Sequence, residues 1–261
     1  SGGCVEEDLL ERLRQGELDT HLPQRVDYGL SAEENERLGL PCGGHLHLVI
    51  QQLDGHDAGW IESILAALGD RRCIRRRLDL ASGETTLENI QHFEPLSFRG
   101  DALAQSFGPR TRMLLVGAGQ LAHCLAELAL AMDYEVIVTD TRAEVLDQWQ
   151  GPAVPLLQGM PDDIVREHAA DSHSVVITLT HDPRIDDMAL MEALTTDAWY
   201  VGALGSRRTT QKRLVRLRQL DLAEAQIQRL HAPVGLEIGS KTPIEIAVAI
   251  MAELTQLRRR A

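Results

Sequence analysis

The chain has 261 residues, of which 44% are hydrophobic, so it can form a buried core and two small domains. Its 39 acidic residues outnumber its 26 basic residues and give a net charge of −13, which argues against a nucleic-acid partner. The four cysteines lack zinc-ligand or thioredoxin spacing, so a reducing cytoplasm is expected. No apolar run is long enough to span a membrane. Because the sequence begins at Ser1 and not at Met, we expect that an upstream piece has been removed.

The first 95 residues are predicted to form a smaller α+β domain. Apolar side chains at helical spacing predict helices around 9–13 and 60–68. The alternating run 45–50 predicts a strand, with its leucines and isoleucine on the inner face. Two further strands, 71–80 and 84–90, flank an Ala-Ser-Gly turn and predict a hairpin.

A linker is predicted at 96–110, because prolines and glycines are frequent around it. From 111 to 261 apolar strands alternate with amphipathic helices, which predicts a parallel sheet with helices on both faces. The predicted strands are 113–117, 135–140, 175–180 and 200–204, and the predicted helices are 121–132, 186–194, 207–220 and 243–257. The fold class is therefore α/β, with a C-terminal Rossmann-like domain that follows the smaller α+β domain.

A glycine turn joins the first of these strands to its helix. Gly117, Gly119 and Ala122 form the pattern G-x-G-x-x-A, a permitted form of the dinucleotide fingerprint. The second glycine lets the backbone approach a diphosphate, which then meets free N–H groups at the helix N-terminus. Asp140 ends the next strand, in the range expected for a carboxylate that binds ribose. Arg142, two residues further on, either could accommodate a 2′-phosphate or is a solvated loop residue. For the motif as a whole, the alternative is a glycine turn that binds no ligand.

Two more loops follow predicted strands and are candidates for the same crevice. His181 and Asp182 follow the third strand, where ligands sit in open α/β sheets, unless the pair is a helix cap with a bystander histidine. Ser206 is a sound N-cap for the next helix, but Arg207 and Arg208 then oppose the helix dipole. A bound phosphate would offset the charge of the two arginines at the helix N-terminus. Exposure of the arginines to solvent, or ion pairs with carboxylates of the chain, would do the same.

Cys42 precedes two glycines and is the cysteine with the strongest case for a functional role. Cys4 lies near a predicted helix N-terminus, where a thiolate is favoured. His45 and His47 share one strand face, which permits metal ligation, although an exposed pair without metal is the simpler interpretation.

Six short blocks along nearly the whole chain resemble the XdhC/CoxI family of xanthine dehydrogenase accessory factors. They are Ser-Gly-Gly-Cys-Val-Glu at 1–6, Cys-Gly-Gly at 42–44, Val-Gly-Ala-Gly at 116–119, Thr-His-Asp-Pro at 180–183, Gly-Ala-Leu-Gly-Ser-Arg-Arg at 202–208 and His-Ala-Pro-Val-Gly-Leu at 231–236. Members usually carry a further N-terminal segment, and Gln120 stands here where histidine is expected in many relatives.

The resemblance implies a role in maturing molybdenum hydroxylases such as xanthine dehydrogenase or CO dehydrogenase. Such a factor is expected to bind molybdenum cofactor, as molybdopterin or its dinucleotide form, to support sulfuration by a cysteine desulfurase, and to pass the cofactor to the apo hydroxylase. It would act as a chaperone and not as a turnover catalyst. The Cys42 thiolate is then a soft ligand suited to molybdenum or sulfur. A homodimer is the default oligomeric state.

Two other functions stay open on the residues alone. An NAD(P)-dependent oxidoreductase is the main alternative, because the fingerprint and Asp140 are generic to that class. None of Tyr28, Tyr134 and Tyr200 has a lysine four residues on, so the short-chain dehydrogenase pair is missing. A nucleotide-sensing regulator without chemistry is the third possibility.

Overall fold

The computed structural model describes residues 3–18, 21–39 and 44–260. Contacts divide the chain into two compact units, Ser1–Pro109 and Arg110–Ala261. Each unit has its own hydrophobic clusters. No helix in the described ranges is long and apolar enough to cross a membrane.

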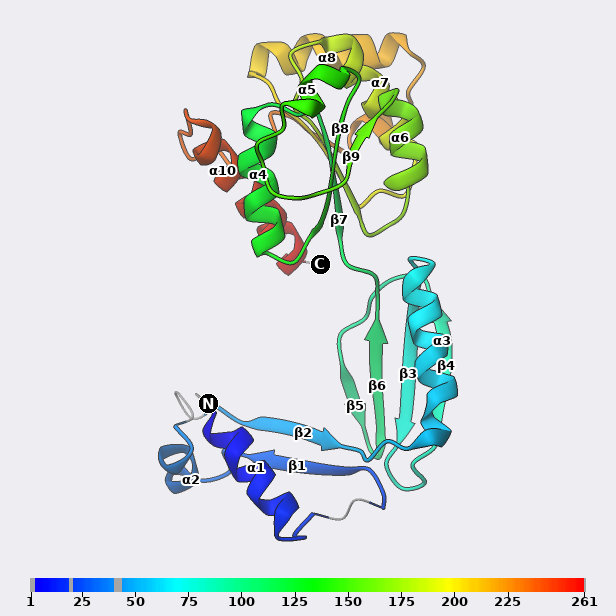
Figure 1. Cartoon of the computed structure of the whole chain (residues 1–261), viewed down its shortest axis with the longest axis vertical. Coiled ribbons are helices and arrows are strands. Elements are labelled where there is room, and N and C mark those ends of the chain that lie inside the picture. Colours follow the sequence, from blue (N-terminus) through cyan, green and yellow to red (C-terminus); the bar gives the residue numbers. More distant parts are fainter. Residues whose placement is uncertain (1–2, 19–20, 40–43, 261) are drawn as a thin grey trace. The chain divides into compact units, whose positions relative to one another are not determined.

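The first unit begins with a two-stranded antiparallel sheet and two helices (Figure 1). Its elements are α1 (Cys4–Arg14), β1 (Gln24–Tyr28), α2 (Ala32–Arg37) and β2 (Leu46–Ile50). Val5 of α1 and Val26 of β1 are buried together, and alternate residues of β2 pack against them. The predicted inner face of the strand at 45–50 is therefore confirmed.

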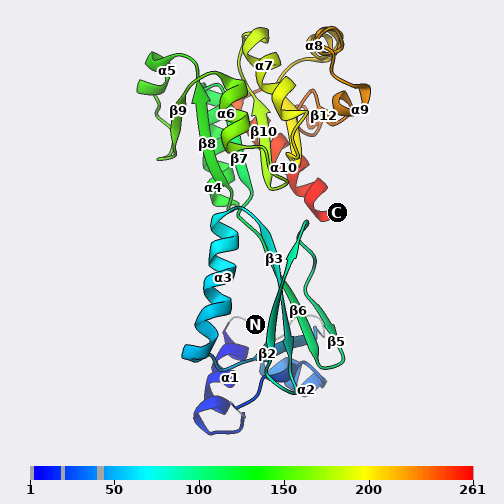
Figure 2. The same cartoon turned by 90° about the vertical axis from the view of Figure 1, so that its right-hand side faces the viewer.

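The rest of this unit is a four-stranded antiparallel sheet in the order β4-β3-β6-β5. Its elements are η2 (Gly55–Asp57), α3 (Ala58–Gly69), β3 (Cys73–Asp79), β4 (Thr85–Ile90), β5 (Ser97–Arg99) and β6 (Ala102–Phe107). Helix α3 lies along one face of the sheet (Figure 2), where Ile64 and Ala67 pack against Ile74. The predicted hairpin is confirmed, because β3 and β4 pair from Cys73↔Ile90 to Leu78↔Thr85.

The linker prediction for 96–110 needs correction. Strands β5 and β6 lie inside it and pair with one another from Ser97↔Ala104 to Arg99↔Ala102, while β6 also pairs with β3. Gly100 makes the turn between β5 and β6 with a φ of 59°. The glycines and prolines thus mark the ends of strands in a sheet, and the division between the units falls after Pro109.

The second unit is a doubly wound α/β domain, as predicted. Its parallel sheet has the order β12-β11-β10-β7-β8-β9. The strands are β7 (Arg112–Val116), β8 (Glu135–Asp140), β9 (Leu156–Gln158), β10 (Ser174–Thr178), β11 (Tyr200–Ala203) and β12 (Leu230–His231). The helices are α4 (Gln120–Ala131), α5 (Ala143–Asp147), α6 (Pro161–His168), α7 (Pro183–Ala193), α8 (Arg207–Gln219), α9 (Glu224–Ile227) and α10 (Pro243–Arg260).

Both faces of the parallel sheet are covered by helices, which explains why its central strands are apolar at nearly every position. Met113 and Leu115 of β7 belong to the cluster under α4 and α10, while Leu114 and Val116 belong to the cluster under α6, α7 and α8. Figure 1 shows α4 and α10 on one side of the sheet and α6 on the other. Strand β7 lies between β8 and β10. From β7 the chain builds β8 and β9 on one side of it and then crosses over to build β10, β11 and β12 on the other side, which creates a switch point beside β7.

Candidate functional site

A cleft of about 580 Å³ lies at this switch point, beyond the carboxyl ends of β7, β8 and β10. Gly117 and Gly119 line it from the loop after β7, and Asp140 lines it from the end of β8. His181 and Asp182 line it from the loop after β10. The structure therefore brings together five of the residues that the sequence singled out.

The glycine turn has the geometry that its spacing predicts. Gly117 has a φ of 108°, and a Cβ there would lie 2.9 Å from Cγ2 of Thr180. At Gly119 the backbone is extended and no heavy atom lies within 4 Å of the place that a Cβ would take. Ala122 is fully buried in the cluster between α4 and the sheet. One glycine thus allows the tight turn, and the other leaves open space beside the backbone.

The N-terminus of α4 faces this cleft without a side-chain cap. The first N–H groups of a helix have no partner within the helix and carry a partial positive charge. At Gly119 they lie at the end of a 12-residue helix. This arrangement is suited to bind an anion through the backbone.

Asp140 is only 4% exposed and is held by several donors. Its Oδ2 accepts from the Ala118 N–H at 3.1 Å and from Nη2 of Arg142 at 3.0 Å, while Oδ1 accepts from Nε of Arg142 at 2.9 Å. Burial by itself raises the pKa of Asp140, but the hydrogen bonds from Arg142 and Ala118 outweigh it, so the pKa lies below its ordinary value. The carboxylate is charged at neutral pH and neutralises Arg142.

The loop after β10 repeats this pattern of an aspartate followed two residues later by an arginine. Asp182 caps α7 by accepting from the Arg184 N–H, and it accepts from Nη2 of Arg184 at 2.8 Å. These bonds lower the pKa of Asp182 to about 2. His181 is exposed beside the pair. Both cleft arginines are therefore neutralised locally, whereas the backbone at Gly119 stays open and has the geometry suited to an anion.

A buried ion pair that the sequence reasoning missed lies beneath the loops. Asp186 and Arg213 are 1% and 2% exposed and meet at 2.7 Å. Asp186 also accepts from Oγ1 of Thr180 at 2.7 Å, and Nη1 of Arg213 donates to the Leu204 carbonyl at 3.1 Å. The pair thus ties the loop after β10 to the loop after β11. Burial raises the pKa of Asp186 above its ordinary value.

The third predicted loop follows β11 but does not line the described cleft. Ser206 caps α8, as predicted, by accepting from the Thr209 N–H at 3.1 Å. Arg207 is exposed, and its Nη2 donates to both carboxylate oxygens of Glu237 at 2.8–2.9 Å. A carboxylate from the chain itself thus relieves this charge at the helix N-terminus. Arg208 is exposed, so a phosphate role for this loop stays a prediction.

The His-Ala-Pro-Val-Gly-Leu block has a structural explanation. Glu253 of α10 accepts from the Tyr200 hydroxyl at 2.8 Å, from the Gly235 N–H at 2.6 Å and from Nδ1 of His231 at 2.9 Å. The rings of Tyr200 and His231 stack with their centroids 4.4 Å apart. This cluster fixes the loop after β12 against α10. In the sequence the block at 231–236 marked this loop, but no spacing rule connects Tyr200 with Glu253, which are 53 positions apart.

The remaining candidates belong to the first unit. Cys42 lies outside the described residues. His45 and His47 stack 6.4 Å apart, and Nδ1 of His47 lies 2.6 Å from Oδ1 of Asp27. No group of three or more metal-ligating side chains occurs in the described part of the chain.

Residues 113–254 match the family model for the XdhC Rossmann domain, which covers more than half of the chain. The chain belongs to the XdhC family. The resemblance that the sequence blocks indicated is thus confirmed, and the matched region includes the glycine turn, Asp140 and the loops after β10 and β11.

Two relatives of this XdhC-family chain match over almost its full length. A protein of Bacillus subtilis named as a probable subunit of xanthine dehydrogenase is 26% identical and is aligned over 100% of this chain and 84% of its own length. The molybdenum cofactor insertion chaperone PaoD of Escherichia coli is 25% identical over 99% of this chain and 73% of its own. A crystal structure described as a xanthine dehydrogenase from Bacillus halodurans has a TM-score of 0.75 at 24% identity, covering 100% of this chain and 82% of that one, and so shares the fold.

Proposed function

We propose that this XdhC-family chain binds molybdenum cofactor and passes it to an apo molybdenum hydroxylase. The names of two relatives support this role, since one is a probable part of a xanthine dehydrogenase and the other is a molybdenum cofactor insertion chaperone. The observation that carries the proposal is the open backbone at Gly119, beside the uncapped N-terminus of α4. The cofactor supplies a molybdenum centre on a pterin, with a phosphate or nucleotide diphosphate tail.

The residues of the cleft fit the anionic end of such a ligand. A site for a phosphate tail needs N–H donors and space for close approach, and the turn at Gly119 offers both. The two aspartate–arginine pairs keep the remaining charge of the cleft balanced. The protein would therefore hold the tail by fixed backbone dipoles, while Asp186 and Arg213 keep the neighbouring loops in place.

Sulfuration by a cysteine desulfurase and a role for Cys42 are part of the same proposal. A thiolate is a soft ligand that suits molybdenum or carries sulfur. The variant Cys42→Ser should keep its fold and its affinity for the tail and yet fail to activate the apo hydroxylase. Cys4→Ser, which removes an exposed thiol on α1, is the matched control.

A second candidate, an NAD(P)-binding oxidoreductase, is favoured by the position of Asp140 at the end of β8. The carboxylate that would receive a ribose hydroxyl is already bound on both oxygens by Arg142 and by the Ala118 N–H. A nicotinamide dinucleotide would have to replace these donors. Titration with NAD and NADP beside a molybdopterin dinucleotide therefore separates the two candidates.

The test of the proposed site is the variant Gly119→Val. Its extra side chain enters open space, so we expect an unchanged melting temperature and an affinity for molybdopterin dinucleotide that falls by about tenfold or more. Gly59→Val is the control, because Gly59 of α3 also has no heavy atom within 4 Å of its Cβ position. Equal affinities of wild type and Gly119→Val in calorimetry would remove the cleft as the binding site.

A further inference from the structure

A basic groove lies on the face of the four-stranded sheet opposite to α3. Along β3 the side chains alternate, with Ile74, Arg76 and Leu78 buried and with Arg75 and Arg77 on the other face. Pairing of β3 with β6 and of β6 with β5 brings Arg75, Arg77 and Arg99 to one groove of about 220 Å³. The groove lies within one sheet of the first unit and shares no lining residue with the cleft.

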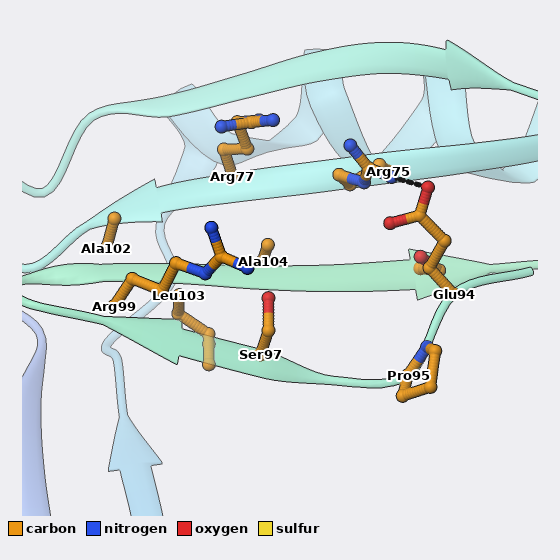
Figure 3. Close-up of a pocket in the computed structure, with 10 residues that line it drawn as sticks. Arg75, Arg77, Glu94, Pro95, Ser97, Arg99, Ala102, Leu103 and Ala104 are labelled. Atoms are coloured by element: carbon orange, nitrogen blue, oxygen red, sulfur yellow. Dashed lines mark ion pairs between the residues drawn. The ribbon is translucent and has the colours of Figure 1, made fainter.

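The floor of the groove is made of small side chains. Ala102, Ala104 and Ser106 of β6 alternate on this face, and Ser97 of β5 pairs with Ala104. Figure 3 shows Arg99 extending across β6 toward Ala104, with the Ser97 hydroxyl directed into the same space. No hydrogen bond joins the hydroxyls of Ser97 and Ser106 to any residue in the described ranges. The groove therefore has a shallow floor with two available hydroxyl groups and cationic walls.

The charges of the groove are not balanced. Arg75 pairs with Glu94 and lies 3.3 Å from Glu88, and Arg77 lies 3.4 Å from the same Glu88. Arg99 has no ion pair or hydrogen bond to any residue that the structure describes. The five charged groups thus sum to +1, in a chain whose net charge is −13. Guanidinium groups clustered on one strand face repel one another, and an anion between them removes that repulsion.

We propose that this groove binds a phosphate dianion, either inorganic phosphate or the phosphomonoester of a small molecule. Guanidinium groups bind phosphate oxygens by paired, charge-assisted hydrogen bonds, and serine hydroxyls supply further donors. The volume of about 220 Å³ is below the range of sites for drug-sized ligands, which suits a single phosphate group and little more. The inference does not depend on the proposed function, because it rests on side chains of the first unit alone.

Two variants test the groove by different means. Arg99→Gln removes the unpaired cation, and Ala104→Leu fills the floor while leaving every arginine in place. Both positions lie on an open sheet face, so folding is checked by the melting temperature and is expected to be retained. Arg14→Gln is the control, because Arg14 of α1 is an exposed arginine outside the groove.

The measurement is a calorimetric titration at low ionic strength with inorganic phosphate, glycerol phosphate and dimethyl phosphate. We expect glycerol phosphate or inorganic phosphate to bind to wild type and to Arg14→Gln with equal affinity, and to bind about tenfold more weakly to Arg99→Gln and Ala104→Leu. Whichever of the two binds more tightly shows whether the groove takes free phosphate or a phosphomonoester. Dimethyl phosphate should bind weakly because it carries one charge. Repeating the titration in Gly119→Val separates the groove from the cleft, since groove binding should persist there.

Four results would overturn the proposal. The first is the absence of phosphate binding to wild type, and the second is an unchanged affinity in both groove variants. The third is a protein that binds an acidic peptide but no phosphate compound, with the peptide binding lost in Arg99→Gln. The groove would then be a site for a partner protein. Loss of phosphate binding in Gly119→Val alone would assign the anion to the cleft.

Discussion

The cleft of the second unit and the groove of the first are the two proposed anion sites of this acidic chain, and they offer different kinds of donor. In the cleft, Arg142 and Arg184 are each neutralised by an aspartate two residues earlier, and the open donors belong to the backbone of the turn. In the groove the donors are side chains, and among the described residues Arg99 keeps its charge without a partner. Local geometry therefore decides where an anion can bind, and a net charge of −13 does not prevent it.

The two regions also differ in what supports them. The loops of the cleft depend on buried polar groups, above all on Asp186 and Arg213. The groove depends on the hydrogen-bonded ladder of β3, β6 and β5, which holds alternate side chains on one face. Changes in the buried network of the second unit should thus disturb the cleft and leave phosphate binding in the groove unchanged.

The largest effect is expected for Arg213→Met. The variant leaves Asp186 buried without its cation, and breaking a buried ion pair in this way costs about 3–5 kcal/mol. Urea unfolding measures the free energy, and calorimetry should show weaker binding in the cleft with unchanged phosphate binding in the groove. The double variant Asp186→Asn/Arg213→Met should regain part of the stability, because it removes the uncompensated charge. A loss below about 1 kcal/mol in the single variant would contradict a central role for this pair.

A smaller loss is expected for Glu253→Ala, on the α10 side of the same sheet. The Tyr200 hydroxyl, in a side chain that is 1% exposed, then loses its acceptor, which costs about 1–3 kcal/mol. Glu253→Gln is the control, because its amide oxygen still accepts from Tyr200. Since this cluster does not line the cleft, ligand affinity there should stay within about twofold of wild type. A large loss of affinity with unchanged stability would instead place His231 or Glu253 in the binding site.

The smallest effect is expected for Asp182→Asn, and it depends on pH. The hydrogen bonds from Arg184 lower the pKa of Asp182 to about 2, so its stabilisation is fully present above the ordinary value of 3.8 and is lost as the pH falls through about 2. The melting temperature of the variant should be lower than that of wild type by less than about 4 °C at pH 7. This difference should close as the pH falls from about 4 to about 2. Glu62→Gln, at an exposed position of α3, should show no such dependence, and a difference that is constant with pH would rule out the pair as its cause.

Local spacing made most of the cleft predictable. The turn at Gly117 and Gly119, the carboxylate of Asp140 and the loop at His181 all follow buried, largely apolar strands. Parallel strands place their carboxyl ends at one edge, so these loops had to meet. The same rule placed Ser206 and Arg207 at this edge, but Glu237, thirty residues along the chain, takes up the charge of Arg207, which no spacing rule indicates.

The groove was hidden because it is made of three strands that come together only in the folded sheet. In the sequence Arg75 and Arg77 belong to an unbroken run of three arginines, which does not show which of them share a face, and Arg99 lay in the segment that glycines and prolines marked as a linker. The β3–β6–β5 register decides that these arginines share a face.

By itself the sequence determined the family, the Rossmann-like sheet and the glycine turn, because these depend on residues that are close along the chain. Tertiary structure alone decided that Arg142 and Arg184 are neutralised, that Asp186 and Arg213 form a buried pair, and that Arg99 shares a sheet face with Arg75. The physical reason is that charge balance and burial are properties of neighbours in space. Side chains 27 positions apart, as Asp186 and Arg213 are, become neighbours only when the helices that carry them pack on the same face of the sheet.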